Sequence, residues 1–195
     1  ITIWAGGPEV SYDAPQFLKR HPEVDGIMCA EGEQTLTELI RYYETEKSQG
    51  KSLDEINGIV YQENRMIHQT PLRDIMNMDD LVFPYEDLKD FEHKIIYYES
   101  SRGCPFSCSY CLSSIDKKLR FRSFYLVEKE LEFFLVHKVP QVKFVDRTFN
   151  CKHSHAIAIW TYIKEHDNGI TNFHFEVAAD LLTEDEIALI QTMRP

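Results

Sequence analysis

Three of the five cysteines in this 195-residue chain fall within eight residues, at Cys104, Cys108 and Cys111. Their spacing is Cys-x-x-x-Cys-x-x-Cys, and thiolates are soft ligands that select iron–sulfur clusters, zinc or copper(I). Three thiolates on one loop can hold three irons of a four-iron cluster and leave the fourth iron open, whereas a structural zinc ion needs four closed ligands. The spacing therefore predicts a 4Fe–4S cluster. A zinc site completed by Cys151 or by a histidine is the alternative.

The overall composition excludes several classes of protein. Acidic residues outnumber basic ones by 32 to 21, which gives a formal net charge of −11. Nucleic-acid and membrane-surface binders need a basic face, so we expect neither partner, and the run 117–122 is the one basic candidate. No apolar run has the length of a membrane span. An odd number of cysteines, three of them clustered, is typical of a reducing cytoplasm rather than of a disulfide scaffold.

The first part of the chain alternates short apolar runs with amphipathic stretches. We expect strands at 1–5 and 26–30, each followed by a helix, and this order predicts a parallel α/β layer. Gly6 and Gly7 follow the first strand, where they either let a ligand approach closely or form only a tight turn. A small hairpin is predicted within 58–68.

From Lys94 onward the pattern predicts three β/α units. Strands at 95–98, 141–146 and 172–179 each precede a helical stretch, and the cysteine loop follows the first strand. In such units the residues that contact ligands lie at the carboxyl ends of the strands. This rule selects Asp146 and Glu176 as neighbours of the cysteine loop.

The remaining polar and sulfur-containing side chains have simpler interpretations. Asp146 either contacts a ligand or caps a helix, and Glu176 either contacts a ligand or forms a buried ion pair with Arg147. Cys29 and Cys151 are expected to be small buried hydrophobic residues. Four side chains are expected to be exposed to solvent: Arg120, Arg122, His153 and His155.

The segment from Cys104 to Cys111, Cys-Pro-Phe-Ser-Cys-Ser-Tyr-Cys, resembles the signature of the radical S-adenosylmethionine (SAM) enzymes. In that family three cysteines hold a 4Fe–4S cluster, SAM chelates the open iron, and an aromatic residue, here Tyr110, precedes the last cysteine. The resemblance implies one-electron reductive cleavage of SAM to methionine and a 5′-deoxyadenosyl radical. It also implies an external electron donor such as flavodoxin or ferredoxin, and a small-molecule substrate that the residues do not identify.

Residues outside the motif extend this resemblance. Gly6 and Gly7, with the segment 31–36, resemble the last third of the cobalamin-binding-type Rossmann domain that precedes the barrel in one large subfamily. The cobalt-ligating motif of that domain, Asp-x-His-x-x-Gly, does not occur in this sequence, so the implication of cobalamin rests on the two glycines. The segment 145–150 resembles a variant in which Asp146 holds the amino group of SAM, with Glu176 as a second contact.

The resemblance implies an α/β fold in three parts. A partial Rossmann-like, cobalamin-binding-type domain is expected over 1–46, a linker with a hairpin over 47–93, and the first half of a partial (β/α) radical SAM barrel over 94–195. We expect a cytoplasmic Fe–S oxidoreductase or methyltransferase, cut at both ends and inactive in this length. The open sheet edge at the third strand of the half-barrel is suited to pairing with a second copy. The alternative is a non-catalytic module that zinc or a cluster stabilises.

Overall fold

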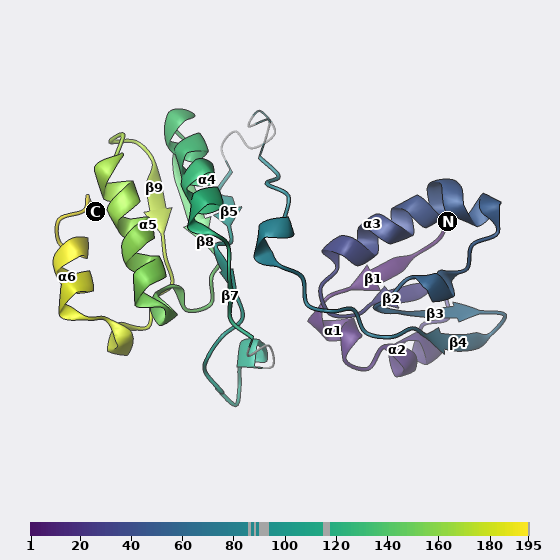
Figure 1. The fold of residues 1–195 in the computed structure, drawn as a ribbon. Coiled ribbons are helices and arrows are strands. Elements are labelled where there is room, and N and C mark those ends of the chain that lie inside the picture. Colours follow the sequence, from purple (N-terminus) through teal and green to yellow (C-terminus); the bar gives the residue numbers. More distant parts are fainter. Residues whose placement is uncertain (86, 88, 90–93, 115–117, 195) are drawn as a thin grey trace. The chain divides into compact units, whose positions relative to one another are not determined.

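The computed structural model describes residues 1–85, 87, 89, 94–114 and 118–194, and it divides into two compact units, Ile1–Met76 and Asn77–Pro195 (Figure 1). Residues 90–93, where we place the end of the linker, and Lys117 of the basic run lie outside the described residues. In the described part of the chain, no helix is long and apolar enough to cross a membrane.

The first unit is built on one four-stranded sheet in the order β1-β2-β3-β4. Strands β1 (Trp4–Gly6) and β2 (Gly26–Met28) are parallel, as predicted. The predicted hairpin forms as β3 (Ile59–Glu63) and β4 (Met66–Gln69), and β3 pairs antiparallel with β2. The hairpin therefore extends the sheet of the first unit.

Helices cover both faces of this sheet (Figure 1). Helices α1 (Pro8–Ser11) and α2 (Ala14–Arg20) pack on the face that carries Ile27. Helix α3 (Glu33–Arg41), extended by a π-turn at Tyr42–Glu46, packs on the opposite face beside Met28. Neighbouring residues of a strand point to opposite faces, so this short strand contributes to two separate cores.

The second unit contains the three predicted parallel strands, β5 (Ile96–Tyr98), β8 (Gln141–Phe144) and β9 (Asn172–His174), in the order β5-β8-β9. The following helices are α4 (Phe124–Val136), α5 (His153–Glu165) and α6 (Glu184–Ile190), and the last begins with the predicted capping box at Thr183. Short 3₁₀ turns lie at Met78–Asp80, Leu112–Ser114, Phe149–Cys151 and Ala179–Leu181.

Strands β8 and β9 end earlier than predicted. Beyond their ends, side chains make hydrogen bonds to the backbone of the neighbouring segments. The amide of Ala178 donates to Asn150 Oδ1, and Asn150 Nδ2 donates back to the Ala178 carbonyl, both at 2.9 Å. After β8, the Asp146 carboxylate accepts from the Ser100 amide at 3.1 Å.

The three-stranded sheet has one covered and one open face. Val142 and Phe144 of β8 are fully buried in the core with α4 and α5. Lys143 lies between them and therefore points to the other face, where Tyr97 is 54% exposed and His174 is exposed. The open face thus carries polar and aromatic side chains, whereas the covered face is apolar.

Candidate functional site

The cysteine loop begins at the carboxyl end of β5 and is closed at its base by a short antiparallel pair, β6 (Ser101–Arg102) with β7 (Arg120–Phe121). Gly103, next to this pair, has a φ of +97°, and a Cβ atom there would lie 2.5 Å from the carbonyl oxygen of Lys118. Only glycine fits such a contact at such a φ. The two strands therefore form a neck that leads directly to Cys104.

The three cysteines of the loop have free thiols and differ in exposure. Cys104 is buried, Cys111 is half-buried and Cys108 is exposed. The amide of Cys111 donates to the carbonyl of Cys108 at 3.2 Å, so the last two cysteines sit on one tight turn. The predicted aromatic residue, Tyr110, is 91% exposed beside them. Three thiol donors on one loop are the donor set that a 4Fe–4S cluster requires.

The alternative of a zinc ion held by the loop would need a fourth ligand, for which Cys151 or a histidine was considered. Among the described residues, no group of three His, Cys, Asp or Glu side chains is close enough to hold one metal ion. Cys151 is half-buried, and burial raises the pKa of its thiol, with further contributions from the charges of Asp146 and Cys104. Of the two other cysteines, Cys29 is buried in the first unit, as predicted.

A buried polar cluster lies directly beneath the neck. The Asp146 carboxylate, 1% exposed, accepts hydrogen bonds from the Ser100 amide at 3.1 Å, the Ser100 hydroxyl at 2.7 Å and the Ser101 hydroxyl at 2.5 Å. The Ser100 hydroxyl also lies 3.0 Å from Nε2 of His155 on α5. Two residues after Asp146, the Thr148 hydroxyl lies 3.7 Å from the Cys104 sulfur. We call Ser100, Ser101, Asp146 and His155 the neck cluster.

Burial shifts the protonation equilibria of this neck cluster. It raises the pKa of Asp146, and the hydrogen bonds from Ser101 and Ser100 offset part of that rise. It lowers the pKa of His155 to about 4, helped by the positive charge of Lys152. His155 was predicted to be exposed, and that prediction is wrong because its ring packs inside, 5.0 Å from the Phe121 ring.

The second predicted carboxylate, Glu176, lies on the open face of the sheet. It is exposed and pairs with Lys143 at 3.2 Å, so the buried ion pair that we considered with Arg147 is not formed, and Arg147 is exposed. The Glu176 backbone carbonyl accepts from the Phe149 amide at 3.0 Å, which ties the segment after β9 to the turn after β8. Its side chain is 49% exposed on the open face, beside Lys143.

In the first unit, the predicted glycines end β1. Gly7 has a φ of +96°, and a Cβ atom there would have no neighbour within 4 Å, so both a backbone constraint and open space are present. A Cβ atom on Gly6 would lie 3.3 Å from the Met28 side chain of the neighbouring parallel strand. The turn thus lies at the carboxyl edge of the sheet, where ligands of α/β folds bind.

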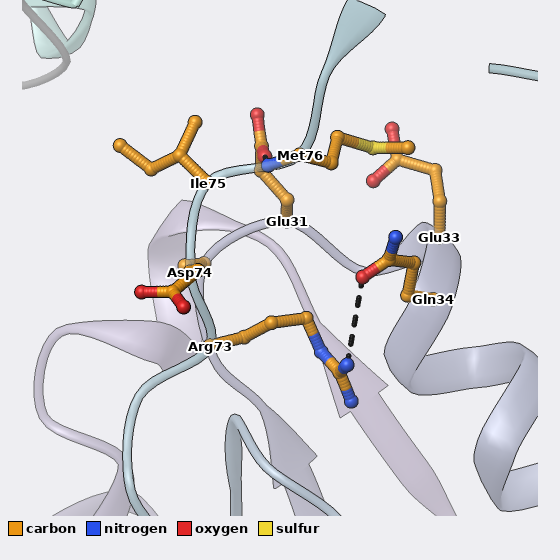
Figure 2. Close-up of a pocket in the computed structure, with 8 residues that line it drawn as sticks. Glu31, Glu33, Gln34, Arg73, Asp74, Ile75 and Met76 are labelled. Atoms are coloured by element: carbon orange, nitrogen blue, oxygen red, sulfur yellow. Dashed lines mark hydrogen bonds between the residues drawn. The ribbon is translucent and has the colours of Figure 1, made fainter. Parts of the chain in front are cut away.

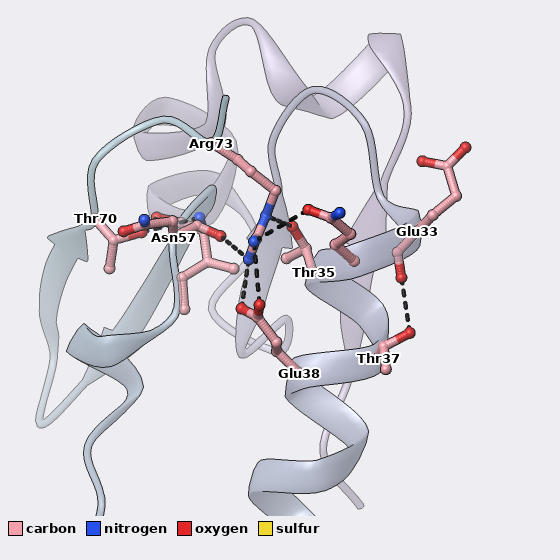
Figure 3. A network of polar contacts seen from close by, with 9 residues as sticks. Glu33, Thr35, Thr37, Glu38, Asn57, Thr70 and Arg73 are labelled. Carbon is pink, nitrogen blue, oxygen red and sulfur yellow. Dashed lines mark hydrogen bonds and ion pairs between the residues drawn. The ribbon is translucent and has the colours of Figure 1, made fainter. Parts of the chain in front are cut away.

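A pocket lies after β2 at the same edge (Figure 2). Its volume of about 30 Å³ is roughly that of one water molecule. Arg73 forms one wall and hydrogen-bonds Gln34 at 3.5 Å and Thr35 at 3.1 Å (Figure 3). It also pairs in bidentate fashion with Glu38 and donates to the Asn57 carbonyl at 3.1 Å. The pocket is too small for a cofactor, and Arg73 fastens the segment after β4 to helix α3.

Sequence reasoning did not identify the neck cluster as a unit. Ser100 and Ser101 stand two residues before the motif, and Asp146 was selected, but their contact depends on the register of β5 against β8, which pairs Tyr98 with Phe144. Ser100 follows Tyr98 by two residues, and Asp146 follows Phe144 by two residues, so the same register brings Ser100 and Asp146 together. In the sequence, the pair of serines two residues before the cysteine motif was the available sign of hydrogen-bond donors at the base of the loop.

Known proteins resemble the chain in sequence and in fold. No family model matches it. An uncharacterized methyltransferase of Pyrococcus horikoshii is 30% identical over 176 residues, 85% of this chain and 37% of that protein. The anaerobic magnesium-protoporphyrin IX monomethyl ester cyclase of Synechocystis is 30% identical over 118 residues, 57% of this chain and 23% of that protein. The chain thus spans well under half the length of these relatives.

Solved structures match nearly the whole chain. The cobalamin-dependent SAM radical enzyme OxsB, with aqua-cobalamin and SAM bound, matches 97% of this chain and 28% of its own with a TM-score of 0.72 at 23% identity. The radical SAM methyltransferase TsrM of Kitasatospora setae, with cobalamin and a [4Fe-4S] cluster bound, matches 98% of this chain and 40% of its own with a TM-score of 0.72 at 16% identity. The motif, the fold and the relatives agree: the proteins that this chain resembles in sequence and in fold include cobalamin-dependent radical SAM enzymes.

Proposed function

We propose that this chain contains the cluster-binding region of a cobalamin-dependent radical SAM enzyme whose reaction is methyl transfer. The single observation that carries the proposal is the loop with three free thiols at Cys104, Cys108 and Cys111, placed by a glycine-dependent neck at the carboxyl end of β5. The name of the Pyrococcus relative and the titles of the OxsB and TsrM structures support the cofactors and the reaction class. The cyclase relative makes ring closure the second candidate reaction class.

Each group of residues has a role in this proposal. The three cysteines would ligate a 4Fe–4S cluster, which when bound supplies the electron for SAM cleavage. Tyr110 lies at the solvent-facing end of the loop, where it can cover a bound nucleotide. Glu176, held beside Lys143 on the open face, can accept a hydrogen bond from an ammonium group such as that of SAM.

The first unit would contribute to cobalamin binding through its strand ends. Gly7 combines a positive φ with open space, so its backbone can approach a bulky ligand at the carboxyl edge of β1. We propose a flavodoxin or ferredoxin as the electron donor, because Cys108 is exposed and a cluster that it ligated would be accessible to a protein partner. We also retain the expectation that the edge of β9 pairs with a second copy, which size-exclusion chromatography with light scattering tests.

The test is anaerobic reconstitution with iron and sulfide, followed by metal analysis. About four irons and as much sulfide per chain are expected, with a change in the electron paramagnetic resonance (EPR) spectrum when SAM is added. Single replacements of Cys104, Cys108 and Cys111 by alanine should abolish iron binding, while Cys29→Ala and Cys151→Ala serve as controls and should retain it. About one zinc per chain in place of iron would contradict the proposal and favour a structural module.

A further inference from the structure

The neck cluster contains a buried carboxylate, Asp146, whose hydrogen-bond partners within the described part of the chain are all neutral groups. Asp146 is 1% exposed, and it accepts hydrogen bonds from the Ser100 amide, the Ser100 hydroxyl and the Ser101 hydroxyl. Burying a carboxylate costs several kcal/mol unless hydrogen bonds compensate it. These three hydrogen bonds provide the compensation, and all come from two consecutive residues where the neck begins, Ser100 and Ser101.

The hydrogen atoms of the neck cluster can be assigned from donor and acceptor capacity. The single hydroxyl hydrogen of Ser100 points to Asp146 at 2.7 Å, because an ionised carboxylate only accepts. The contact of 3.0 Å between Ser100 Oγ and His155 Nε2 therefore requires that Nε2 carries a hydrogen and donates it. The order of donation then runs from His155 on α5 through Ser100 to Asp146.

The same strand end also contacts the first cysteine. Thr148 is buried two residues after Asp146, and its hydroxyl lies 3.7 Å from the Cys104 sulfur. Segment 146–148 therefore touches the loop at two places, the two serines at its base and the first thiol. Ser101 is also part of the neck, where it pairs with Phe121.

Two roles for Asp146 compete. As a direct contact of SAM, it would need an oxygen that faces the open side of the sheet. Both carboxylate oxygens of Asp146 instead accept hydrogen bonds from Ser100 or Ser101. The neck cluster lies on the side of the sheet that α5 covers, because His155 belongs to α5. Glu176, which is exposed on the open face, is the carboxylate placed for direct contact.

We infer that Asp146 is a positioning residue, which acts through Ser100 and Ser101 to set the direction in which the neck delivers Cys104 to the cluster. This inference rests on the proposed function. Groups that orient metal ligands from outside the ligand shell commonly change metal affinity by roughly 10- to 100-fold when they are replaced. Asp146→Asn retains the size of the side chain but replaces one acceptor oxygen by a donor, and Ser101→Ala removes a single donor.

The experiment measures cluster binding and spectra rather than turnover. After anaerobic reconstitution, Asp146→Asn and Ser101→Ala are expected to retain the cluster about tenfold more weakly against a chelator. They are also expected to alter the EPR spectrum of the reduced cluster before SAM is added. Glu186→Gln is the matched control, because Glu186 is a fully buried carboxylate with Thr183 and His153 as partners, far along the chain from the loop. It should leave both readouts unchanged.

Each outcome separates the alternatives. If both variants retain the cluster with an unchanged spectrum and lose only the SAM-induced change, Asp146 is a contact of SAM and the inference is overturned. Hydrogen exchange of residues 99–104 in the cluster-free protein gives a second reading: it should accelerate about tenfold in Ser101→Ala and not in Glu186→Gln. A wild-type protein that binds no iron overturns the proposed function itself, and the inference with it.

Discussion

In each unit an arginine fastens an irregular segment to a helix, and the two arginines, Arg73 and Arg122, differ in burial. In the first unit, Arg73 binds Glu38 of α3 and the Asn57 carbonyl, with 16% and 37% of the Arg73 and Glu38 side chains exposed. In the second unit, Arg122 binds Glu130 of α4 at 2.5 Å and donates to the carbonyls of Met78 and Leu81, with only 6% and 8% exposed. The two arginine–glutamate pairs are therefore chemically similar, but the pair in the second unit is much more shielded from water.

The difference shows why the type of residue does not decide its energetic role. An exposed ion pair contributes little because water replaces either partner. When one member of a buried pair is removed, the other is left as an uncompensated charge, which costs much more. Glu130 also accepts from the buried Tyr98 hydroxyl at 2.7 Å, and burial, with the nearby Glu130 carboxylate, raises the pKa of Tyr98 well above its usual value. The Arg122 network is therefore integral to the second core, whereas the Arg73 network lies at the rim of the first.

The largest effect is expected for Arg122→Met. It leaves Glu130 buried without its cation and two carbonyls without their donor, so the free energy of unfolding should fall by about 3–5 kcal/mol. Denaturant unfolding, with hydrogen exchange over α4, measures this loss. The double variant R122M/E130L removes both charges and should recover most of the stability. If the double variant is as unstable as the single one, burial of an unpaired charge is not the cause.

The next effect concerns His155 and pH. Its pKa is lowered from 6.5 to about 4 in the folded protein, so the unfolded chain takes up the proton first as the pH falls. Stability contributed by neutral His155 is complete above pH 6.5 and is lost between pH 6.5 and about 4, by about 3 kcal/mol in total. Unfolding of wild type and His155→Gln across this range tests it. The variant should be less stable at pH 7 but should lose less stability on acidification, and equal slopes would contradict the shift.

A smaller effect separates two glycines with nearly the same φ. Gly103→Ala and Gly7→Ala both carry the cost of a positive φ, about 1–2 kcal/mol. Gly103→Ala must in addition displace the Lys118 backbone, so we expect it to cost about 2 kcal/mol more and to loosen the neck. Thermal unfolding of the two variants gives the comparison. Equal losses would mean that the neck adjusts freely around the added methyl group.

The smallest effect is expected for Arg73→Lys. Lysine retains the charge but cannot form the bidentate pair with Glu38 and also reach the Asn57 carbonyl, so about 1 kcal/mol should be lost from the first unit. Hydrogen exchange over α3 measures this change, with Arg41→Lys on the exposed side of the same helix as control. A loss as large as that of Arg122→Met would remove the distinction between the rim and the core network.

Several features could be predicted from the sequence because they depend on local patterns. The three-cysteine spacing, the apolar stripes of α4 and α5 and the capping box at Thr183 are each contained in a few neighbouring residues. The parallel order of β5, β8 and β9 followed from the alternation of strands and helices, and the structure confirms it. Asp146 and Glu176 were selected by their places after strands.

What the sequence by itself determined is therefore the chemistry: three thiolates on one loop after a strand, within a β/α repeat. What only the tertiary structure decided is the environment of each polar group. Arg122 and His155 were both predicted to be exposed and are both buried: Arg122 binds Glu130 of α4 and two backbone carbonyls, and His155 lies on the buried side of α5. Asp146 and Glu176 look alike in the chain, yet strand register places one beneath the neck and the other on the open face. Burial and register arise from contacts between distant segments, and no local pattern contains them.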